Sequence, residues 1–404
     1  MAEKFVRSAT RVRSFENPEF DFQLLRSLGV VFAGGGSVGE VLTVAAAIGE
    51  PTPEKWVKEF STMADKVEQE AARCRKLGRN VSARSLFLRA SMYYRAAEYF
   101  LDLDSPEHDP MGLKSRDAFR SACPLLEPEV EVVEIPYAPI PLPGYFARSP
   151  RGEGKSLIIC GGFDSSGEEL YFNALGALER GFNVFFFDGP GQTGMMRLKP
   201  RLPFRPDYEA VIGPVFDYVL GREEVDPERV GLLGISFGGY LAPRAAAFDA
   251  RIKALIPDSP ITDWRVYLGD EFGPEKEKIP DFTSADLRQA GDEEATLLQK
   301  QMLIHMMRKF GVDSWHALLA SLSEFRLSPE NQARIICPVL ACIGEGEGEE
   351  AKRQSEELVG NVSGTAASHT FTVTWGADAH CQVNNTARFW QVAYDWLESL
   401  FEKK

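Results

Sequence analysis

One short stretch constrains this chain more than any other: an apolar run at residues 230–235 that passes into Gly234-Ile-Ser-Phe-Gly238. Residues 241–248 follow and form a helical pattern rich in small side chains. A strand joined to a helix through G-x-S-x-G makes a very tight turn, which holds the serine hydroxyl clear of the sheet as a nucleophile. Short glycine–serine turns also arise by chance. The strand before this one and the helix after it favour the functional interpretation, with Ser236 as the nucleophile.

Length and charge restrict the class of protein. At 404 residues the chain exceeds one compact core of ordinary size, so one large domain with a second element is expected. Its 44% hydrophobic and 26% charged residues are typical of a soluble globular protein.

The net charge is −14, and no Lys/Arg run offers a surface for nucleic acid. No stretch approaches the roughly 18 apolar residues that span a bilayer. Residues 1–8 lack the apolar core of a signal peptide. We therefore expect a cytoplasmic protein with neither a nucleic-acid nor a membrane partner.

Metal and cofactor sites are not expected. The six cysteines and five histidines are scattered, without a C-x-x-C or H-x-x-x-H pair, which favours reduced core cysteines over zinc ligands or disulfides. A glycine-rich run at residues 34–39 superficially resembles a phosphate-binding loop. It lacks the lysine of G-x-x-x-x-G-K-[ST] and follows no clear strand. A flexible turn between helices is the better interpretation, and we predict no cofactor.

The first part of the chain has a helical pattern. Thr52 can cap a helix that Pro53 begins, and residues 56–71 then place an apolar side chain at i, i+4, i+7 spacing. Two further helical patterns follow, at residues 83–101 and 112–122. A proline-bounded segment, residues 124–128, marks the change to a different pattern. We therefore predict an antiparallel helical unit over residues 1–128, ahead of any strand.

From residue 129 onward, short strands alternate with helices. Uniformly apolar strands rich in β-branched and aromatic residues indicate a mostly parallel sheet that helices cover on both faces. The first two strands have the pattern of an antiparallel hairpin at its edge. The strands are predicted at residues 130–135, 142–148, 156–160, 182–187, 230–235, 254–256, 339–343 and 370–374. The helices between them are predicted at residues 168–180, 206–220, 241–248, 350–358 and 386–401.

One interval breaks this alternation. No strand pattern occurs between residues 257 and 338, and structureless loops of that length are rare in compact domains. Helical patterns cover residues 284–310 and 314–322, after an aromatic and acidic segment at residues 261–272. We predict a helical insertion at about residues 261–332, over the C-terminal edge of the sheet. Together with residues 1–128 it could roof the active site.

A nucleophilic serine needs a base, which a carboxylate must hold in place. After a turn of this kind the chain order is serine, then acid, then histidine. His380 follows the last predicted core strand, in the loop before the final helix, and is our candidate base. His305 and His316 belong to the insertion, and His369 precedes a strand. The alternative for His380 is a solvated loop histidine.

The tetrahedral intermediate needs two backbone N–H donors for its oxyanion. One is expected from Phe237, immediately after the nucleophile. The other is expected from Phe163, in the loop Cys160-Gly-Gly-Phe-Asp-Ser-Ser166 that follows a predicted strand. Glycines in that loop let the backbone approach a substrate closely.

Three motifs and one helical stretch resemble a known family. Asp188-Gly-Pro-Gly-Gln192, Gly234-Ile-Ser-Phe-Gly-Gly239 and Ala379-His-Cys-Gln382 look like loops of α/β-hydrolases that carry an N-terminal helical lid. Residues 82–98 are similar to that lid. The group includes the 2,6-dihydroxypseudooxynicotine hydrolases and the polyketide-shortening hydrolases. The resemblance covers nearly the whole chain and implies an α/β-hydrolase core over residues 129–404, with residues 1–128 as the lid and a structural role for the loop at residues 188–192.

The acid is expected just past the strand at residues 339–343, where the chain offers Gly344-Glu-Gly-Glu-Gly-Glu-Glu350. Most α/β-hydrolases place it three residues after a glycine at this strand's end, which points to Glu347. Glu345 is a close rival, and Asp258, at the end of the preceding strand, is an alternative site. The remaining glutamates fit a solvated acidic turn. The chain departs from its relatives in offering Glu rather than Asp, and Cys160-Gly-Gly rather than His-Gly before the oxyanion donor.

Relatives of this type cleave C–C bonds next to carbonyls. The resemblance therefore implies a β-diketone or acyl-phenol substrate, small or polyketide-like. The same residues would serve a carboxylesterase or thioesterase, or an acyltransferase or cyclase whose lid excludes water. A non-catalytic partner-binding protein of the same fold is a further alternative. The aromatic-rich helical units, with Trp56, Trp264, Tyr267 and Trp315, could equally form a homodimer interface.

Overall fold

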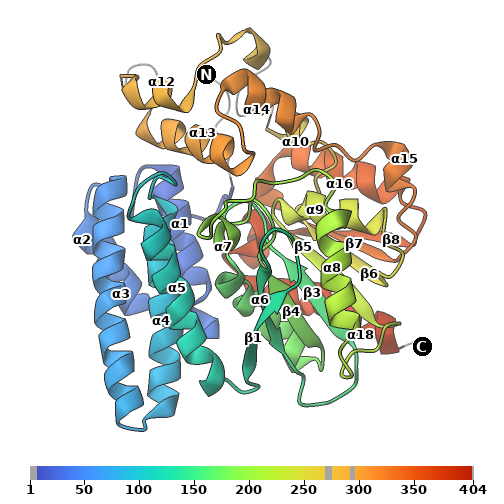
Figure 1. The fold of residues 1–404 in the computed structure, drawn as a ribbon, viewed down its shortest axis with the longest axis horizontal. Helices are drawn as coiled ribbons and strands as arrows, with labels where there is room; N and C mark the ends of the chain where they lie inside the picture. The colour runs from blue at the N-terminus through green and yellow to red at the C-terminus, as the bar shows by residue number, and fades with distance from the viewer. Residues whose placement is uncertain (1–6, 269–274, 292–295, 403–404) are drawn as a thin grey trace.

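The computed structural model describes residues 7–268, 275–291 and 296–402, and Figure 1 shows two packed parts. One part consists of helices that all precede the first strand, and we call it the N-terminal helical unit (residues 18–125). The other is an eight-stranded sheet with its covering helices. The helices of the unit are α1 Pro18–Gly29, α2 Val38–Ile48, α3 Pro53–Lys76, α4 Asn80–Tyr99 and α5 His108–Ala122.

Local sequence accounts for the long helices α3 and α4. The Thr52 side chain accepts the N–H of Lys55, and Pro53 occupies the first turn, as predicted. The apolar stripe of α3 is buried, and its Trp56 donates a hydrogen bond from Nε1 to the carbonyl of Ala96 in α4 at 2.8 Å. The last of the three helices predicted for this unit corresponds to α5, which begins four residues before the expected start at Gly112.

The sheet has the strand order β1-β2-β4-β3-β5-β6-β7-β8. The β1–β2 hairpin is antiparallel and lies at the edge, as predicted, and the strands from β4 to β8 run parallel. Strands β3 to β7 are buried along their whole length because helices pack on both faces. The strands are β1 Val130–Ile135, β2 Leu142–Ala147, β3 Ser156–Cys160, β4 Asn183–Phe187, β5 Val230–Ile235, β6 Ala254–Asp258, β7 Val339–Gly344 and β8 Ala366–Phe371.

The helices of the core follow the predicted alternation. Their order along the chain is α6 Gly167–Glu179, α7 Thr193–Met196, α8 Glu209–Leu220, α9 Gly238–Ala246, α16 Glu349–Asn361, α17 Thr386–Phe389 and α18 Asp395–Glu402. A π-helical turn, Trp390–Tyr394, joins α17 to α18, so the final helical segment is continuous but not regular.

Two element predictions were wrong. The last strand is Ala366–Phe371 rather than residues 370–374, whose second half forms a 3-10 turn, Val373–Trp375. Because β8 is an edge strand with mostly exposed side chains, its polar sequence lacks the apolar signal of the other strands. The single helix predicted over residues 284–310 is two helices, since Thr283 and Thr296 each cap a new start.

The segment between β6 and β7 is helical. It contains α10 Trp264–Tyr267, α12 Ser284–Gln289, α13 Leu297–Lys309, α14 Trp315–Leu322 and α15 Pro329–Gln332. Figure 1 shows α12 and α13 beyond the end of the N-terminal helical unit, beside the carboxyl ends of the strands. Arg288 and Arg308 join this segment to Asp104 at 2.8 Å each. Residues 1–6 and 269–272, used in the sequence arguments above, lie outside the described residues. In the described part of the chain, no helix combines the length and apolar character needed to cross a bilayer.

Candidate active site

The turn after β5 has the geometry expected for an exposed nucleophile. Ser236 adopts φ 61°, a left-handed conformation that non-glycine residues rarely take, and its N–H donates to the carbonyl of Asp258 at 2.9 Å. A Cβ on Gly234 would lie 2.0 Å from the carbonyl oxygen of Gly238, and a Cβ on Gly238 would lie 2.9 Å from the carbonyl oxygens of Cys160 and Gly161. The turn therefore requires its glycines and presents Ser236 at the C-terminal edge of the sheet.

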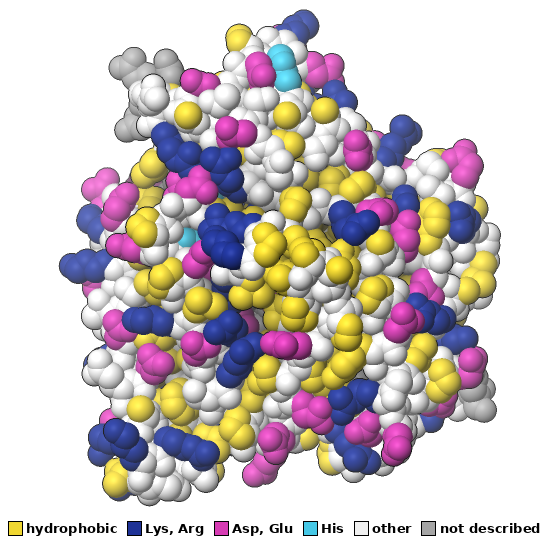
Figure 2. Space-filling view, in the orientation of Figure 1, with side chains coloured by type: hydrophobic (Ala, Val, Ile, Leu, Met, Phe, Trp, Pro, Cys, Tyr) yellow, Lys and Arg dark blue, Asp and Glu magenta, His cyan; other side chains and the backbone are white. Residues whose placement is uncertain are grey.

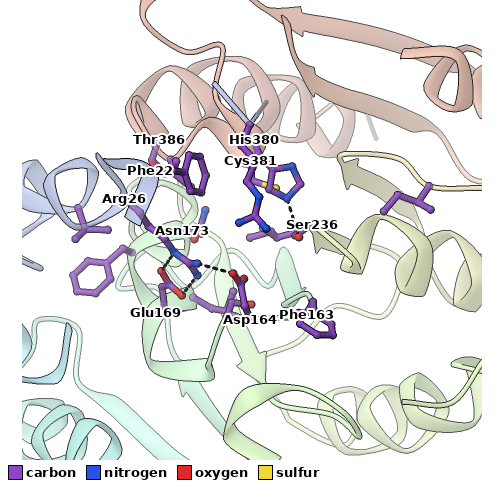
Figure 3. A pocket seen from close by; sticks show the side chains of 18 of the residues that line it. Phe22, Arg26, Phe163, Asp164, Glu169, Asn173, Ser236, His380, Cys381 and Thr386 are labelled. Atoms are coloured by element: carbon purple, nitrogen blue, oxygen red, sulfur yellow. Dashed lines mark hydrogen bonds and ion pairs between the residues drawn. The ribbon is translucent and has the colours of Figure 1, made fainter. Parts of the chain in front are cut away.

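His380 connects the serine to a carboxylate. It begins a 3-10 turn, His380–Gln382, that follows the last strand. Its Nε2 lies 2.9 Å from the Ser236 hydroxyl, and its Nδ1 lies 2.5 Å from Oε2 of Glu347. Because a carboxylate only accepts, Nδ1 carries the proton and Nε2 is free to take one from the serine. Figure 3 shows the imidazole directed at Ser236.

Three carboxylates were candidates for the acid, and the structure separates them. Glu347 is buried, receives the N–H of Gly344 on Oε1 at 2.7 Å, and contacts His380 with Oε2. Glu345 instead accepts the N–H of Val373 at 2.8 Å. Asp258 is fully buried, and neither of its oxygens has a hydrogen-bond partner among the described residues. Burial, together with the charge of Glu347, raises the pKa of Asp258 well above its usual value.

A residue absent from the sequence prediction completes this arrangement. Ser259 follows Asp258 and, like Ser236, adopts a positive φ, 67°. Its hydroxyl donates to Oε2 of Glu347 and lies 3.2 Å from Nδ1 of His380. Since a non-glycine residue with positive φ at a strand end has no periodic signature, only the three-dimensional structure reveals this contact.

The loop after β3 packs directly on the turn that carries Ser236. A Cβ on Gly162 would lie 2.7 Å from both the N atom of Phe237 and the Cβ of Ser236. Gln192, in the loop after β4, supports the same loop by donating from Nε2 to the carbonyl of Gly161 at 2.6 Å. Within the described residues, neither the N–H of Phe163 nor that of Phe237 has a hydrogen-bond acceptor. Two unpaired donors therefore flank the approach to Ser236.

A cavity of about 120 Å³ lies over Ser236 and His380. The N-terminal helical unit, α10 and α13 all contribute to its wall, so segments far apart in the sequence meet around Ser236. Its lining is mostly apolar, and includes Phe22, Phe163, Phe172, Ile261, Trp264 and Met306. Figure 2 shows hydrophobic side chains gathered near the middle of the face where the two parts meet, with Lys and Arg side chains beside them.

Residues that sequence reasoning could not interpret form one polar side of this cavity. Arg26 of α1 pairs with Glu169 at 2.5 Å and with Asp164 at 3.0 Å, as Figure 3 shows. Arg95 of α4 adds a contact to Glu169 at 3.2 Å. Burial alone would raise the pKa of Asp164, but Arg26 and Arg95 outweigh it and hold the pKa well below its usual value.

A second buried ionic layer joins α4 to the core. Arg197 pairs with Glu98 of α4 at 2.5 Å and with Glu168 of α6 at 2.9 Å, and all three side chains are at most 3% exposed. Nearby, Asp188 receives the N–H groups of Gly167 and Gly194. Burial and the charge of Glu168 raise the pKa of Asp188 to about 7. These contacts hold the loop at residues 188–192 against the sheet.

The chain's first described residues reach the histidine loop, and we call residues 7–10 the N-terminal strap. The carbonyl of Arg7 accepts the N–H of His380 at 2.7 Å. The fully buried carboxylate of Asp378 accepts the N–H groups of Ala9 at 2.6 Å and Thr10 at 3.2 Å. The Asp378 carbonyl accepts the N–H of Gly346, beside Glu347. Burial alone would raise the pKa of Asp378, but hydrogen bonds from Thr10 and Ala9 outweigh it and lower the pKa.

The cysteines and histidines form no alternative chemical centre in this part of the molecule. All six cysteines are buried and unpaired. Within the residues that the structure describes, no group of three His, Cys, Asp or Glu side chains is arranged to hold a metal ion.

Comparisons with known proteins first define the class. The model of the prolyl oligopeptidase family matches residues 211–305, which include Ser236. The crystal structure of the 2,6-dihydroxy-pseudo-oxynicotine hydrolase is similar in fold, with a TM-score of 0.71 at 23% identity over 92% of this chain and 95% of that one. The architecture is thus that of an α/β-hydrolase.

Sequence relatives then define the family. The α/β hydrolase gkaG of Penicillium citrinum is 34% identical over 369 residues, which are 84% of each chain. The 20-hydroxy-prefusarin hydrolase FUS2 of Gibberella moniliformis is 40% identical over 261 residues, 61% of this chain and 62% of that protein, so this match spans less than two thirds of the relative. The chain belongs to the α/β-hydrolase family and is a hydrolase, which confirms the resemblance drawn from its motifs.

Proposed function

We propose that the protein is a serine hydrolase that cleaves a C–C bond next to a carbonyl group, in a small-molecule or polyketide-like substrate. One observation carries the proposal: His380 bridges the Ser236 hydroxyl, at 2.9 Å, and the Glu347 carboxylate, at 2.5 Å, beneath a mostly apolar cavity. A serine, a histidine and a buried carboxylate in this order form the proton-transfer chain that activates a hydroxyl nucleophile.

In the proposed mechanism, Ser236 Oγ adds to the substrate carbonyl while His380 Nε2 takes its proton. The buried carboxylate of Glu347 stabilises the imidazolium that forms. The oxyanion of the tetrahedral intermediate is received by the N–H groups of Phe237 and Phe163, both of which lack an acceptor among the described residues.

Collapse of this intermediate breaks the C–C bond. The electron pair of that bond passes to the leaving group as an enolate, and His380 returns its proton to the enolate carbon. Water, deprotonated by His380, then attacks the acyl-enzyme and releases a carboxylic acid and free Ser236. A β-diketone or an acyl-phenol satisfies this scheme, because only a carbanion next to a second carbonyl or on a phenol ring is stable enough to leave.

Two observations support a substrate of this kind. The cavity is mostly apolar, and residues of α1, α10 and α13 line it. We propose that residues 1–128 and 261–332 act together as a roof over the reacting bond. Moreover, a relative in the same family, FUS2, is named as a hydrolase of 20-hydroxy-prefusarin, and we propose a natural-product substrate here as well. An ester or thioester hydrolase, an acyltransferase or cyclase would use the same residues, and a partner-binding protein would use none of them.

The test combines labelling with paired substrates. A fluorophosphonate probe should label Ser236, and Ser236→Ala should abolish both labelling and turnover while the melting temperature stays close to that of the wild type. β-Diketones and 4-nitrophenyl esters with the same acyl group are then assayed, and products are identified by mass. Diketone cleavage into an acid and a ketone supports the proposal; ester turnover alone indicates an esterase, and absent labelling indicates a non-catalytic protein.

A further inference from the structure

A second cavity, of about 210 Å³, adjoins the one over Ser236. It lies among α4, α5, α13 and the loop after β3, and the two cavities have Arg7, Phe163, Asp164 and Met302 in common. Phe163 thus lines both the cavity over Ser236 and this second cavity. Like the first cavity, it has a mostly apolar lining surface, but several charged residues contribute to its wall, among them Arg95, Glu98 and Lys309.

Lys309, the last residue of α13, lines this second cavity and is only 4% exposed. Its ammonium donates to the carbonyl of Phe163 and to the hydroxyl of Thr193, the latter at 3.1 Å. Both acceptors are neutral, and within the described residues no carboxylate forms an ion pair with it. An ammonium has three donors, so one N–H has no acceptor among the described residues, and the carboxylates of Asp164, Glu98 and Asp188 act on the charge without forming an ion pair.

The other cations nearby are already paired. Arg26 contacts Asp164 and Glu169, and Arg95 contacts Glu169. Arg7 has Glu19 at 3.8 Å. Buried charges in proteins are normally paired, because an isolated charge in a medium of low dielectric constant is costly. A buried ammonium that forms no ion pair with the described residues, in the wall of a cavity, is therefore best explained by an anionic group of a ligand.

The neighbouring histidine does not supply this positive charge. His305 lies one helical turn before Lys309, and its Nε2 donates to the carbonyl of Leu101 at 3.0 Å. Burial, reinforced by the charge of Lys309, lowers the pKa of His305 to about 3, so the ring is neutral. Its other ring nitrogen is then an acceptor, which suits a hydroxyl group rather than an anion.

The ammonium is close enough to act on the same substrate that Ser236 attacks. A residue spans at most about 3.6 Å, so an ammonium bonded to the Phe163 carbonyl lies within about 7 Å of the Phe163 nitrogen. We infer that Lys309 forms a leaving-group site, in which its ammonium binds the oxygen that becomes anionic when the C–C bond breaks. This inference rests on the proposed function and deepens it: the substrate carries a ketone, enol or phenol oxygen beyond the scissile bond.

The step balances without a further reactant. As the C–C bond breaks, its electron pair forms the C=C bond of the enolate, and the negative charge moves to the oxygen held by Lys309. The proton that His380 took from Ser236 passes to the enolate carbon. Lys309 keeps its own proton throughout and contributes by stabilising the developing charge. A simple ester, whose leaving oxygen departs directly from the attacked carbon, does not need this site.

Lys309→Met tests the inference, since methionine matches the side chain in length without a charge. A β-diketone and a 4-nitrophenyl ester with the same acyl group share the serine, the base and the oxyanion donors. We expect kcat/KM for the diketone to fall about 100-fold and that for the ester to fall less than about 10-fold. Lys309→Gln, which keeps a neutral donor, should give an intermediate loss.

Lys300→Met is the matched control: Lys300 is a second buried lysine of α13, donates to the carbonyl of Ala290 at 2.6 Å and lines neither cavity. In Lys300→Met, the ratio of kcat/KM for the diketone to kcat/KM for the ester should equal that of the wild type. Equal losses on both substrates in Lys309→Met would overturn the inference, because they would mean that Lys309 only anchors the Phe163 loop.

A binding measurement separates this inference from the proposed function. The enolate anion of dimedone, a cyclic 1,3-diketone that is ionised at neutral pH, is titrated by isothermal calorimetry into Ser236→Ala protein and into the Ser236→Ala, Lys309→Met double variant. It should bind the single variant at least about 10-fold more tightly. If the wild type cleaves no diketone, the proposed C–C hydrolase activity is wrong, and this titration alone then tests whether Lys309 binds an anion. Equal binding to both proteins overturns the site.

Discussion

The carboxylate of Asp378 accepts the main-chain N–H of Ala9 at 2.6 Å, although 369 positions separate the two residues. The same residue binds the N–H of Gly346 through its carbonyl, and the adjacent strap carbonyl binds the N–H of His380. One buried aspartate thus connects the beginning of the described chain, the turn of Glu347 and the loop of His380. The positions of His380 and Glu347 are therefore held in part by residues that lie outside the sheet.

Asp378→Ala should lower kcat about 100-fold with a much smaller change in KM, because a shift of about 1 Å in a catalytic group has that effect. Stopped-flow or steady-state hydrolysis of a 4-nitrophenyl ester measures both constants. Asp117→Ala, which removes an exposed carboxylate of α5, is the control and should leave kcat unchanged. An equal rise in KM with kcat preserved would contradict a positioning role for Asp378.

The acid can be identified by three conservative variants. Glu347→Gln should reduce kcat by roughly 10³–10⁴-fold, because an amide cannot stabilise the imidazolium. Asp258→Asn should stay within about threefold of the wild type, since the Asp258 side chain makes no hydrogen bond to His380 and burial raises its pKa well above the usual value. Glu345→Gln, which affects a hydrogen bond to Val373, is a third comparison and should also remain active. A large loss in Asp258→Asn alone would reassign the acid.

Gly162→Ala tests the oxyanion site. The added Cβ would lie 2.7 Å from the N atom of Phe237, so the loop after β3 must shift away from the turn. We expect a loss of about 10²–10³-fold in kcat, comparable to removal of one oxyanion donor. Gly39→Ala is the control, because a Cβ there meets nothing within 4 Å. Its activity should be unchanged, and its stability equal or higher by up to about 1 kcal/mol. Full activity in Gly162→Ala would argue against this oxyanion site.

The ionisation of Lys309 predicts a pH effect on one substrate class. Burial lowers the pKa of Lys309 to about 8; Asp164, Glu98 and Asp188 act in the opposite direction, and Arg197 adds to the lowering. The diketone-to-ester ratio of kcat/KM should therefore fall as pH rises through about 8, where the ammonium loses its charge. The ratio in Lys309→Met should not vary over that range. A wild-type ratio that is constant between pH 7 and 9 would contradict the prediction.

The same ionisation affects stability with a defined sign. The pKa of Lys309 is lower in the folded protein than in the unfolded chain, so above pH 8 the unfolded state binds more protons. The contribution of this group to the free energy of unfolding then rises with pH until the unfolded value is passed. Urea titrations between pH 7 and 10 should show the free energy of unfolding of the wild type rising with pH relative to that of Lys309→Met.

Local sequence patterns predicted the parts of the site that local chemistry determines. The turn of Ser236 and the alternation of strands and helices each follow from a few consecutive residues. Which of Glu345 and Glu347 contacts His380 could not be predicted from such patterns, because it depends on which carboxylate the Gly344 N–H holds toward His380. Arg26 and Asp378 could not be found either, since their partners are far away in the sequence and polar side chains carry no periodic signal.

The ionic layer of Glu98, Glu168 and Arg197 has a consequence for how such hydrolases diverge. Removing one member of a buried ion pair leaves an uncompensated charge, which costs about 3–5 kcal/mol. Exchanging the N-terminal helical unit between relatives should therefore fail unless the exchanged helix brings a glutamate at the position of Glu98. Homologues should vary these three positions together or not at all, and chimaeric enzymes with new substrate ranges should be built by transferring the helix and its partners as one block.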